Sequence, residues 1–280
     1  MTVGIIGTGM MGGSFAWLIS EKNPSWNLIG YDASEENLEK AVEVGFIDEA
    51  VSLDELVKRS DLIIITIPVN AIVKLLPKVL DGISNKQVVM DIGSTKEQIV
   101  DVIKDHSKRK RFVATHPMWG TEYSGPENAV KGAFKGRVAV ICNKEESDKE
   151  AVDLVESLYD LVPMQKVYME AHEHDIHAAY VSHISHIASY ALALTVLEKE
   201  REEDKIFQLA GGGFESTVRL AKSHAAMWVP IFMQNKENVL DVLNEHISQL
   251  RKFKACLEKE NFDYLQELIE GANKIKRIIK

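Results

Sequence analysis

A glycine-rich turn near the start of the chain is the feature that most constrains the fold. The run GTGMMG, residues 7–12, directly follows an apolar strand-like run and opens a helical pattern. In this context a G-x-G-x-x-G motif is typical of dinucleotide-binding sites. Gly7 permits a tight turn, Gly9 lets the backbone approach a pyrophosphate, and Gly12 lets the helix pack close to the strand. The alternative is a glycine-rich turn that binds no ligand.

Asp32 ends the second predicted strand, residues 27–32. An acidic side chain there accepts hydrogen bonds from the adenosine ribose and repels a 2′-phosphate, which favours NAD over NADP. An ordinary aspartate at a strand end is the alternative. Two later turns, at 65–72 and 91–96, also follow strands, where an open α/β sheet binds its ligand. The residues that we predict to contact NAD are Gly7, Thr8, Gly9, Met10, Met11, Gly12, Asp32, Pro68 and Ser94.

The first 170 residues alternate between short β-rich runs and helical patterns. Strands are predicted at 2–7, 27–32, 61–68, 87–93, 111–117 and 137–143, and a surface helix at 34–45 starts with a serine cap and stops at a glycine. Ser94 can also cap a helix that starts at Thr95. This rhythm predicts a Rossmann-type, doubly wound and mostly parallel sheet with helices on both faces.

The character of the sequence changes after residue 170, where no convincing strand remains. Long helical patterns cover 171–200 and 235–260, and the main break between them is LAGGGFEST, residues 209–217. The first pattern is too apolar and too long for a surface helix, so it either joins two domains or buries itself in a partner subunit. We therefore predict a dinucleotide-binding domain over 1–170 and an all-α substrate and dimerisation domain over 171–280.

Composition excludes several classes of protein. The net charge of −9 over 280 residues disfavours nucleic-acid binding, which needs clustered positive charge. The one basic run, KRKR at 108–111, is interpreted as a solvated loop. Two distant cysteines suggest no disulfide framework, no signal peptide is evident, and no apolar run reaches the roughly 18 residues that span a bilayer. These features predict a cytoplasmic protein that does not enter a membrane.

His116 ends the predicted strand 111–117, immediately before Pro117. A histidine in that place can be packing, a metal ligand or a base. A bound nicotinamide would lie across these strand ends, so His116 could accept a proton while a hydride leaves the substrate for NAD⁺. Its ordinary pKa near 6.5 leaves the imidazole mostly neutral at pH 7.

Five of the nine histidines fall between 172 and 186, which raises the possibility of a metal site. The segment is predicted to be helical, and His172 and His174 would not share a face of that helix. The pairs 174/177 and 183/186 are separated by more than two turns, so we predict no metal. The alternative is that Ser182 and His186, four residues apart on one face, line a polar substrate cavity.

Together these motifs resemble the prephenate dehydrogenase family over nearly the whole chain. The segments that carry the resemblance are GTGMMGGS, DIGSTK, THPMWGTE, HDIHAAYVSHISH and STVRLAKSHAAMW, in that order. The resemblance implies that His116 is the catalytic hydrogen-bond acceptor and that Ser94 orients it and the substrate hydroxyl. It also implies a homodimer formed through the helical domain. Residues on pocket-lining positions are Thr121, Glu122, Ser182, His183, His186, Gly212, Arg219 and Trp228.

The function implied is the NAD-dependent oxidative decarboxylation of prephenate to 4-hydroxyphenylpyruvate in tyrosine biosynthesis. Arg219 is the candidate for binding a substrate carboxylate, with a surface salt bridge as its alternative. Departures from the family pattern at Trp119, Ser185 and Ser216 leave substrate preference and product feedback open. Arogenate dehydrogenase, a β-hydroxyacid dehydrogenase, an imine or pyrroline reductase and a non-catalytic NAD-binding protein are the alternatives.

Overall fold

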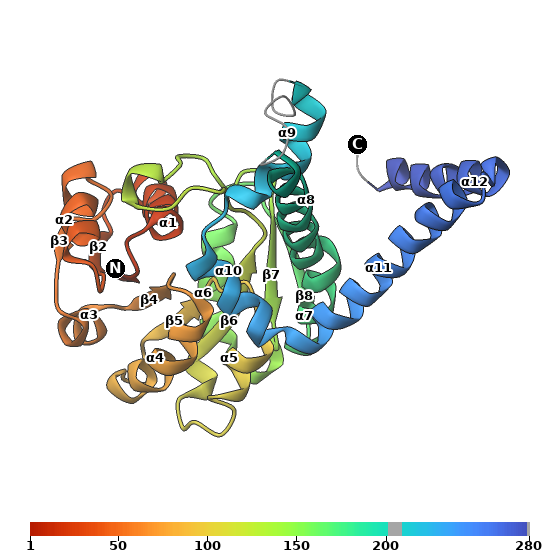
Figure 1. Cartoon of the computed structure of the whole chain (residues 1–280). Helices are drawn as coiled ribbons and strands as arrows, with labels where there is room; N and C mark the ends of the chain where they lie inside the picture. The colour runs from red at the N-terminus through yellow and green to blue at the C-terminus, as the bar shows by residue number, and fades with distance from the viewer. Residues whose placement is uncertain (201–208, 279–280) are drawn as a thin grey trace.

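Eight strands form one sheet in the computed structural model, which describes residues 1–200 and 209–278 (Figure 1). The order across the sheet is β3-β2-β1-β4-β5-β6-β7-β8, and every neighbouring pair is parallel except β6 and β7. This arrangement confirms the predicted Rossmann-type, mostly parallel sheet. The strands are β1 (Thr2–Ile6), β2 (Asn27–Tyr31), β3 (Glu49–Ala50), β4 (Leu62–Ile65), β5 (Val88–Asp91), β6 (Phe112–Pro117), β7 (Val138–Cys142) and β8 (Gln165–Met169).

Helices cover both faces of the sheet, because its central strands are apolar on both sides. One core lies between the sheet and α1, α2 and α6, and the other lies between the sheet and α3, α4 and α5. Trp228 and Ile231 from the later helix α10 (Ala225–Gln234) join the second core. The helices of this half are α1 (Met10–Lys22), α2 (Glu35–Val44), α3 (Leu53–Arg59), α4 (Val69–Gly82), α5 (Glu97–Asp101) and α6 (Lys149–Tyr159).

The surface helix predicted from its end signals is present. Ser34 accepts a hydrogen bond from the backbone N–H of Asn37 at 3.2 Å, which caps α2, and Gly45 ends the helix with a left-handed φ of 86°. Helix α3 starts with a capping box, in which Ser52 and Glu55 each satisfy the other's backbone N–H.

Two strands were not predicted from the sequence. β3 has only two residues, both exposed, so it carries no apolar pattern that could be read. β8 is an edge strand that is only partly buried, and it pairs in parallel with β7. The strand β7 runs antiparallel to β6, which places its N-terminal end beside Pro117.

The interpretation of the basic run as a solvated loop is wrong for half of its residues. Arg109 and Arg111 are 6% and 8% exposed. Arg109 binds Glu146 at 2.6 Å and the carbonyl of Phe112, whereas Arg111 donates to the carbonyl oxygens of Lys86 and Gln87. A guanidinium can satisfy several buried carbonyls at once, so the run ties the entry of β6 to neighbouring loops.

The described part of the chain after Met169 consists of helices joined by short turns. α7 (Ala171–Ala178) continues through a π-helical turn at Ala179–His183 into α8 (Ile184–Glu200). α9 (Gly212–Val218) begins inside the predicted break, and α11 (Lys236–Glu258) carries α12 (Phe262–Ala272) away from the body of the molecule (Figure 1). π-turns are frequent at functional sites because they shift the phase of the side chains that follow.

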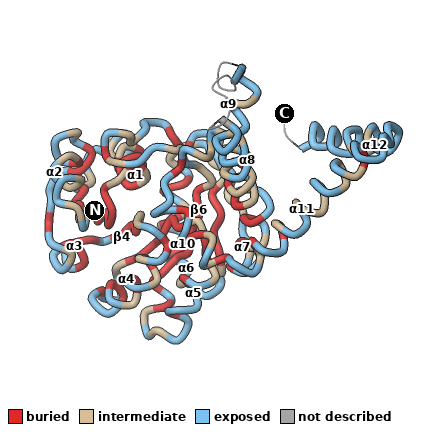
Figure 2. Tube along the Cα trace, in the orientation of Figure 1, coloured by how far each residue is buried: buried red, intermediate tan, exposed pale blue. Residues whose placement is uncertain are grey.

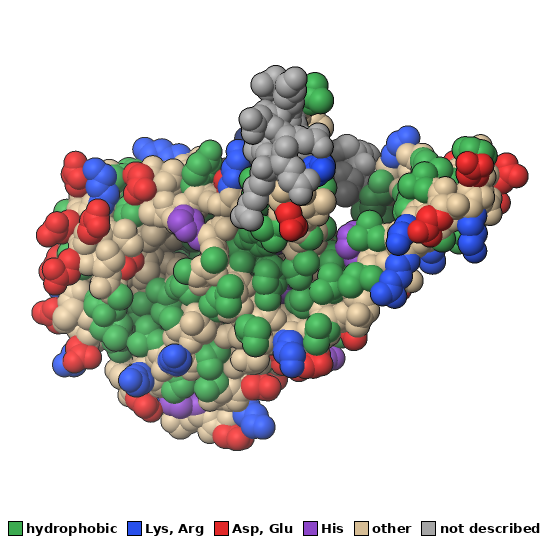
Figure 3. All heavy atoms as spheres, in the orientation of Figure 1, with side chains coloured by type: hydrophobic (Ala, Val, Ile, Leu, Met, Phe, Trp, Pro, Cys, Tyr) green, Lys and Arg blue, Asp and Glu red, His purple; other side chains and the backbone are tan. Residues whose placement is uncertain are grey.

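The tube of α11 and α12 is coloured mostly as exposed or intermediate in Figure 2, and hydrophobic side chains gather on the face of the molecule that Figure 3 shows. The segment 171–199 is long and apolar enough to cross a membrane by length and composition, and 11% of its most apolar window is buried. The prediction that no segment reaches this criterion is therefore wrong. Exposed apolar residues include Leu194, Leu197, Leu250, Leu257 and Phe262.

Candidate active site

The glycine turn has the geometry that close approach to a phosphate requires. Gly7 has a φ of 98°, a conformation that side chains disfavour, and its N–H donates to Tyr31. A Cβ on Gly12 would lie 2.1 Å from the carbonyl oxygen of Gly7, so only glycine lets helix α1 pack this closely. A Cβ on Gly9, by contrast, would meet nothing within 4 Å. The loop therefore fits a dinucleotide, with open space at Gly9 and the start of α1 beyond it.

Asp32 lies just after β2, beside the glycine turn. One carboxylate oxygen accepts the N–H of Thr8 at 2.8 Å, and the other accepts the N–H of Ser34 at 2.9 Å. These bonds hold the carboxylate at the carboxyl end of β2, the position that suits a ribose.

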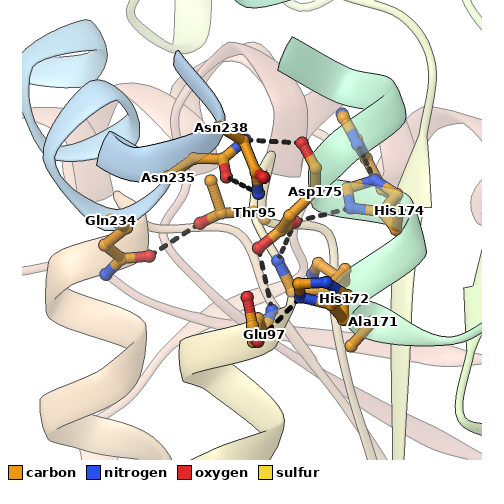
Figure 4. A network of polar contacts seen from close by, with 12 residues as sticks. Thr95, Glu97, Ala171, His172, His174, Asp175, Gln234, Asn235 and Asn238 are labelled. Atoms are coloured by element: carbon orange, nitrogen blue, oxygen red, sulfur yellow. Dashed lines mark hydrogen bonds and ion pairs between the residues drawn. The ribbon is translucent and has the colours of Figure 1, made fainter. Parts of the chain in front are cut away.

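The turn after β5 is held from the helical half of the chain. Asp175 of α7 accepts the backbone N–H groups of Lys96 at 2.8 Å and Glu97 at 3.0 Å, which are the first groups of α5 (Figure 4). The expected helix start at Thr95 with Ser94 as its cap is therefore wrong. The helix begins at Glu97 and a carboxylate distant in sequence caps it, since both amides would otherwise be buried without an acceptor.

His116 lies at the end of β6 and is 9% exposed. Its Nδ1 lies 2.8 Å from Nε2 of His174, whose Nδ1 lies 2.7 Å from Asp175. Burial holds the pKa of His116 well below its ordinary value, and the nearby His174, Lys96 and His183 lower it further. The imidazole is therefore neutral and can accept a proton.

A fully buried lysine supports the same strand end. Lys96 binds the carboxylate of Asp91, and its ammonium also donates to the carbonyl of Thr115 at 2.8 Å. The hydroxyl of Thr115 contacts the carbonyl of Asp91 and the hydroxyl of Tyr159, both at 2.6 Å. A buried ion pair with further hydrogen bonds fixes geometry more than it adds stability. The residue before His116 is thus locked in place.

His183 and His186 follow His174 along the same continuous helical segment. Asn235 contacts Nδ1 of His183 at 3.2 Å and donates to the carbonyl of Asp175 at 2.6 Å. Burial lowers the pKa of His183 to about 4. The ring of His186 stacks on Trp228 with centroids 3.4 Å apart, and burial also lowers its pKa. His183 Nε2 and the indole nitrogen of Trp228 are buried and have no hydrogen-bond partner among the described residues.

Arg219 binds Glu122, six residues beyond His116, at 2.9 Å. Half of the Arg219 side chain is exposed, whereas only 12% of Glu122 is. The proximity of its own backbone N–H and of the Arg219 guanidinium lowers the pKa of Glu122. The structure thus brings Arg219 to the loop that follows His116.

Other predicted residues are less closely joined to His116. No hydrogen bond within the described chain involves the side chains of Ser94 or Ser182; Thr121 contacts only the nearby Tyr123, and Gly212 begins the exposed helix α9. Pro68 caps α4 at the carboxyl end of β4, and Met10 and Met11 open α1. Across residues 1–200 and 209–278, no three His, Cys, Asp or Glu side chains gather in a way that could hold a metal ion.

Sequence reasoning missed the residues that support the end of β6 and His116. His174 was considered only as a metal ligand, and Asp175, Lys96 and Asn235 were not considered at all. His174 and Asp175 stand inside the segment HDIHAAYVSHISH and Lys96 inside DIGSTK, so proximity to those motifs was the one available signal. A charged residue in a polar-looking turn is normally exposed, and only the fold reveals that these are buried.

A dinucleotide loop and a buried neutral histidine at the carboxyl ends of one sheet define a two-domain, NAD-dependent oxidoreductase. Residues 15–167 match the prephenate dehydrogenase nucleotide-binding domain, and residues 170–271 match the prephenate dehydrogenase dimerization domain. The chain belongs to the prephenate dehydrogenase family, as the resemblance predicted.

Individual relatives agree with this assignment. The chain is 32% identical to the prephenate dehydrogenase of Bacillus subtilis (strain 168), over 94% of this chain and 72% of that protein. The prephenate dehydrogenase from A. aeolicus, solved with hydroxyphenyl propionate and NAD⁺, superposes with a TM-score of 0.90 at 32% identity, covering 99% and 97% of the two chains. Synechocystis arogenate dehydrogenase has a TM-score of 0.79 at 24% identity over the whole of both chains, which shows a shared fold.

Proposed function

We propose that this chain catalyses the NAD-dependent oxidative decarboxylation of prephenate to 4-hydroxyphenylpyruvate, with His116 accepting the hydroxyl proton. The observation that carries the proposal is the buried neutral imidazole at the end of β6. Its Nδ1 is engaged by His174, and its Nε2 forms no hydrogen bond with any described residue. The A. aeolicus relative binds NAD⁺ together with a hydroxyphenyl acid, which supports a substrate of this chemical class.

The proton balance of the reaction suits a weak, buried base. Bound NAD⁺ supplies the hydride acceptor. As hydride leaves the hydroxyl-bearing ring carbon, the oxygen becomes carbonyl-like and its proton strongly acidic, so a base with a depressed pKa can accept it. The bond to the ring carboxylate then breaks, its electron pair enters the ring, carbon dioxide departs, and the oxygen regains the proton as a phenol. His116 therefore holds one proton transiently and returns it.

Side-by-side kinetics with prephenate and arogenate test this function. We expect NADH to form with NAD⁺ and prephenate at a higher kcat/KM than with arogenate, and 4-hydroxyphenylpyruvate to accumulate in equal amounts. Glu122 is already paired with Arg219, so it offers little unbalanced negative charge to the ammonium of arogenate. Turnover of neither substrate would contradict the proposal, and faster turnover of arogenate would reassign the substrate.

Arg219 is proposed to bind a carboxylate of the substrate, sharing its guanidinium with Glu122. Ser94 is proposed to orient His116 and the hydroxyl, since its turn follows the strand next to β6. The remaining proposed pocket residues either come from the loop after His116 or surround His183 and Trp228. They are Thr121, Glu122, Ser182, His183, His186, Gly212 and Trp228.

Arg219→Ala is expected to raise the KM for prephenate by roughly 10- to 100-fold with a smaller effect on kcat, because a charge-assisted hydrogen bond is lost. Steady-state kinetics at saturating NAD⁺ measure this. The matched control is Arg59→Ala, which removes another exposed arginine–glutamate pair, Arg59 with Glu49 at 2.9 Å. A KM equal to that of the control would leave Arg219 with a structural role.

The remaining proposals concern organisation. We propose a homodimer, because exposed apolar side chains cover α8, α11 and α12 and the matching family domain is described as a dimerization domain. The same contact, rather than a membrane, would cover the apolar segment 171–199; His174, Asp175 and His183 are buried within it. The boundary between residues 170 and 171 follows the change from β8 to α7. A cytoplasmic location fits two unpaired cysteines.

A further inference from the structure

Three buried side chains form a linear chain of hydrogen bonds from the sheet into the helical half. His116 contacts His174 at 2.8 Å, and His174 contacts Asp175 at 2.7 Å. His174 and Asp175 are 2% and 1% exposed. Water therefore has little access to these two bonds, and both nitrogens of His174 find their partners within the protein.

The direction of these bonds follows from Asp175. Its carboxylate already accepts two backbone N–H groups at the start of α5 and can only accept from His174 as well. The proton of a neutral His174 is therefore on Nδ1, which leaves Nε2 as an acceptor. Nδ1 of His116 must then donate, and Nε2 of His116 is left without a proton.

We infer that His174 and Asp175 are positioning residues that keep the proton of His116 on Nδ1, so that Nε2 is the atom that accepts the substrate proton. This inference rests on the proposed function of His116. When His116 takes the second proton, its Nδ1–H still points along the same chain toward a carboxylate, which stabilises the imidazolium. The charged or titratable groups nearest to His116, apart from this pair, are Lys96 and His183, and both favour the neutral ring.

The Asp175 carboxylate also caps α5, and this second set of hydrogen bonds fixes its orientation. Asp175 caps α5 in the turn that follows β5, while Asn235 holds the Asp175 carbonyl at 2.6 Å (Figure 4). A rotation of the carboxylate that released His174 would also uncap α5. The geometry of the proton acceptor is thus tied to the turn that contains Ser94.

The protonation of His116 can be read directly from nitrogen chemical shifts. The full chain is labelled with ¹⁵N-histidine, saturated with NAD⁺ at mildly alkaline pH, and His116 is assigned by its loss in His116→Asn. We expect a protonated Nδ1 and an unprotonated Nε2. A proton on Nε2, or on both nitrogens, would overturn the inference whatever the activity of the enzyme.

Two sets of variants test whether His174 and Asp175 set the position of the proton on His116. Asp175→Asn leaves one acceptor oxygen for the three N–H groups that Asp175 accepts, so it is expected to weaken the alignment of His174 and to lower kcat by roughly 10- to 100-fold. Its control is Glu173→Gln, the same acid-to-amide change on the same helix beside another histidine, His177, at 3.5 Å. This control should keep wild-type kinetics and the wild-type spectrum.

The second set leaves Asp175 in place, so that α5 keeps its cap. His174→Gln keeps an acceptor toward His116 and a donor toward Asp175, whereas His174→Leu keeps neither. We expect the glutamine variant to retain the Nδ1-protonated form of His116 and at least tenfold more activity than the leucine variant. Equal kcat and equal spectra in the two would overturn the inference. Full activity of His116→Asn would instead contradict the proposed base. The spectra of the wild-type chain would still report the tautomer of His116.

Discussion

His116→Asn is expected to lower kcat with prephenate by roughly 10²- to 10⁴-fold, the usual contribution of a general base. The Kd for NAD⁺ should stay within the error of the wild type, because the dinucleotide loop at residues 7–12 lies on a different strand-to-helix turn. Stopped-flow NADH formation and a fluorescence titration with NAD⁺ separate the two effects. A variant that turns over at nearly the wild-type rate would remove His116 from the mechanism.

The pH profile provides an independent reading of the same residue. The active form is neutral, and burial lowers the pKa of His116 well below 6.5, so activity should persist as the pH falls through 6.5. The acid limb of log kcat/KM, which reports the free enzyme, should therefore lie below that value. A limb at or above 6.5 would mean that another group controls the rate or that the imidazole is accessible to water.

Lys96→Met is expected to lower the free energy of unfolding by about 3–5 kcal/mol, a large share of the roughly 5–15 kcal/mol that domains possess. The methionine fills the space, but Asp91 loses the ammonium that faces it, and both side chains are fully buried. Burial already raises the pKa of Asp91, with Lys96 opposing that rise, so the variant should take up a proton on folding. Urea unfolding at several pH values measures both effects.

The double variant Asp91→Asn, Lys96→Met is the control for that loss. It removes the uncompensated charge along with its partner, so it should recover part of the lost stability. If the double variant is no more stable than Lys96→Met, the damage comes from packing or from the lost bond to Thr115. Loss of prephenate turnover in a double variant that folds well would point to a role for the pair in holding the end of β6.

Local signals explain which elements the sequence predicted. The apolar runs of β1, β4, β5, β6 and β7 and the cap and stop residues of α2 are properties of adjacent residues, so they were readable without a fold. β3 and β8 lie toward the sheet edges and carry weak patterns, and they were missed. The basic run 108–111 was predicted to be a solvated loop, because no residue adjacent in sequence reveals the carbonyl groups that accept from Arg111.

Some residues of the candidate site could likewise be predicted from local sequence, whereas others could not. Gly7, Gly12 and His116 could be singled out because backbone geometry and strand position are encoded locally. The partners of His116 could not, since His174 is 58 residues away in sequence and Asp175 caps a helix 79 residues before it. Ser94 was assigned a capping role that a more distant carboxylate performs, because side chains from another part of the chain compete for the same N–H groups.

The hydrogen bonds from the start of α5 to Asp175 affect which halves of related proteins can be joined in one chain. Its two halves look like interchangeable modules, each matched by its own family description. Asp175, which we propose to position the imidazole, comes from one half, whereas the imidazole and the turn that Asp175 caps come from the other. A chimera that joins halves from two relatives is therefore expected to be active only if both halves carry the matching residues of this contact. The two halves would then have to be exchanged together.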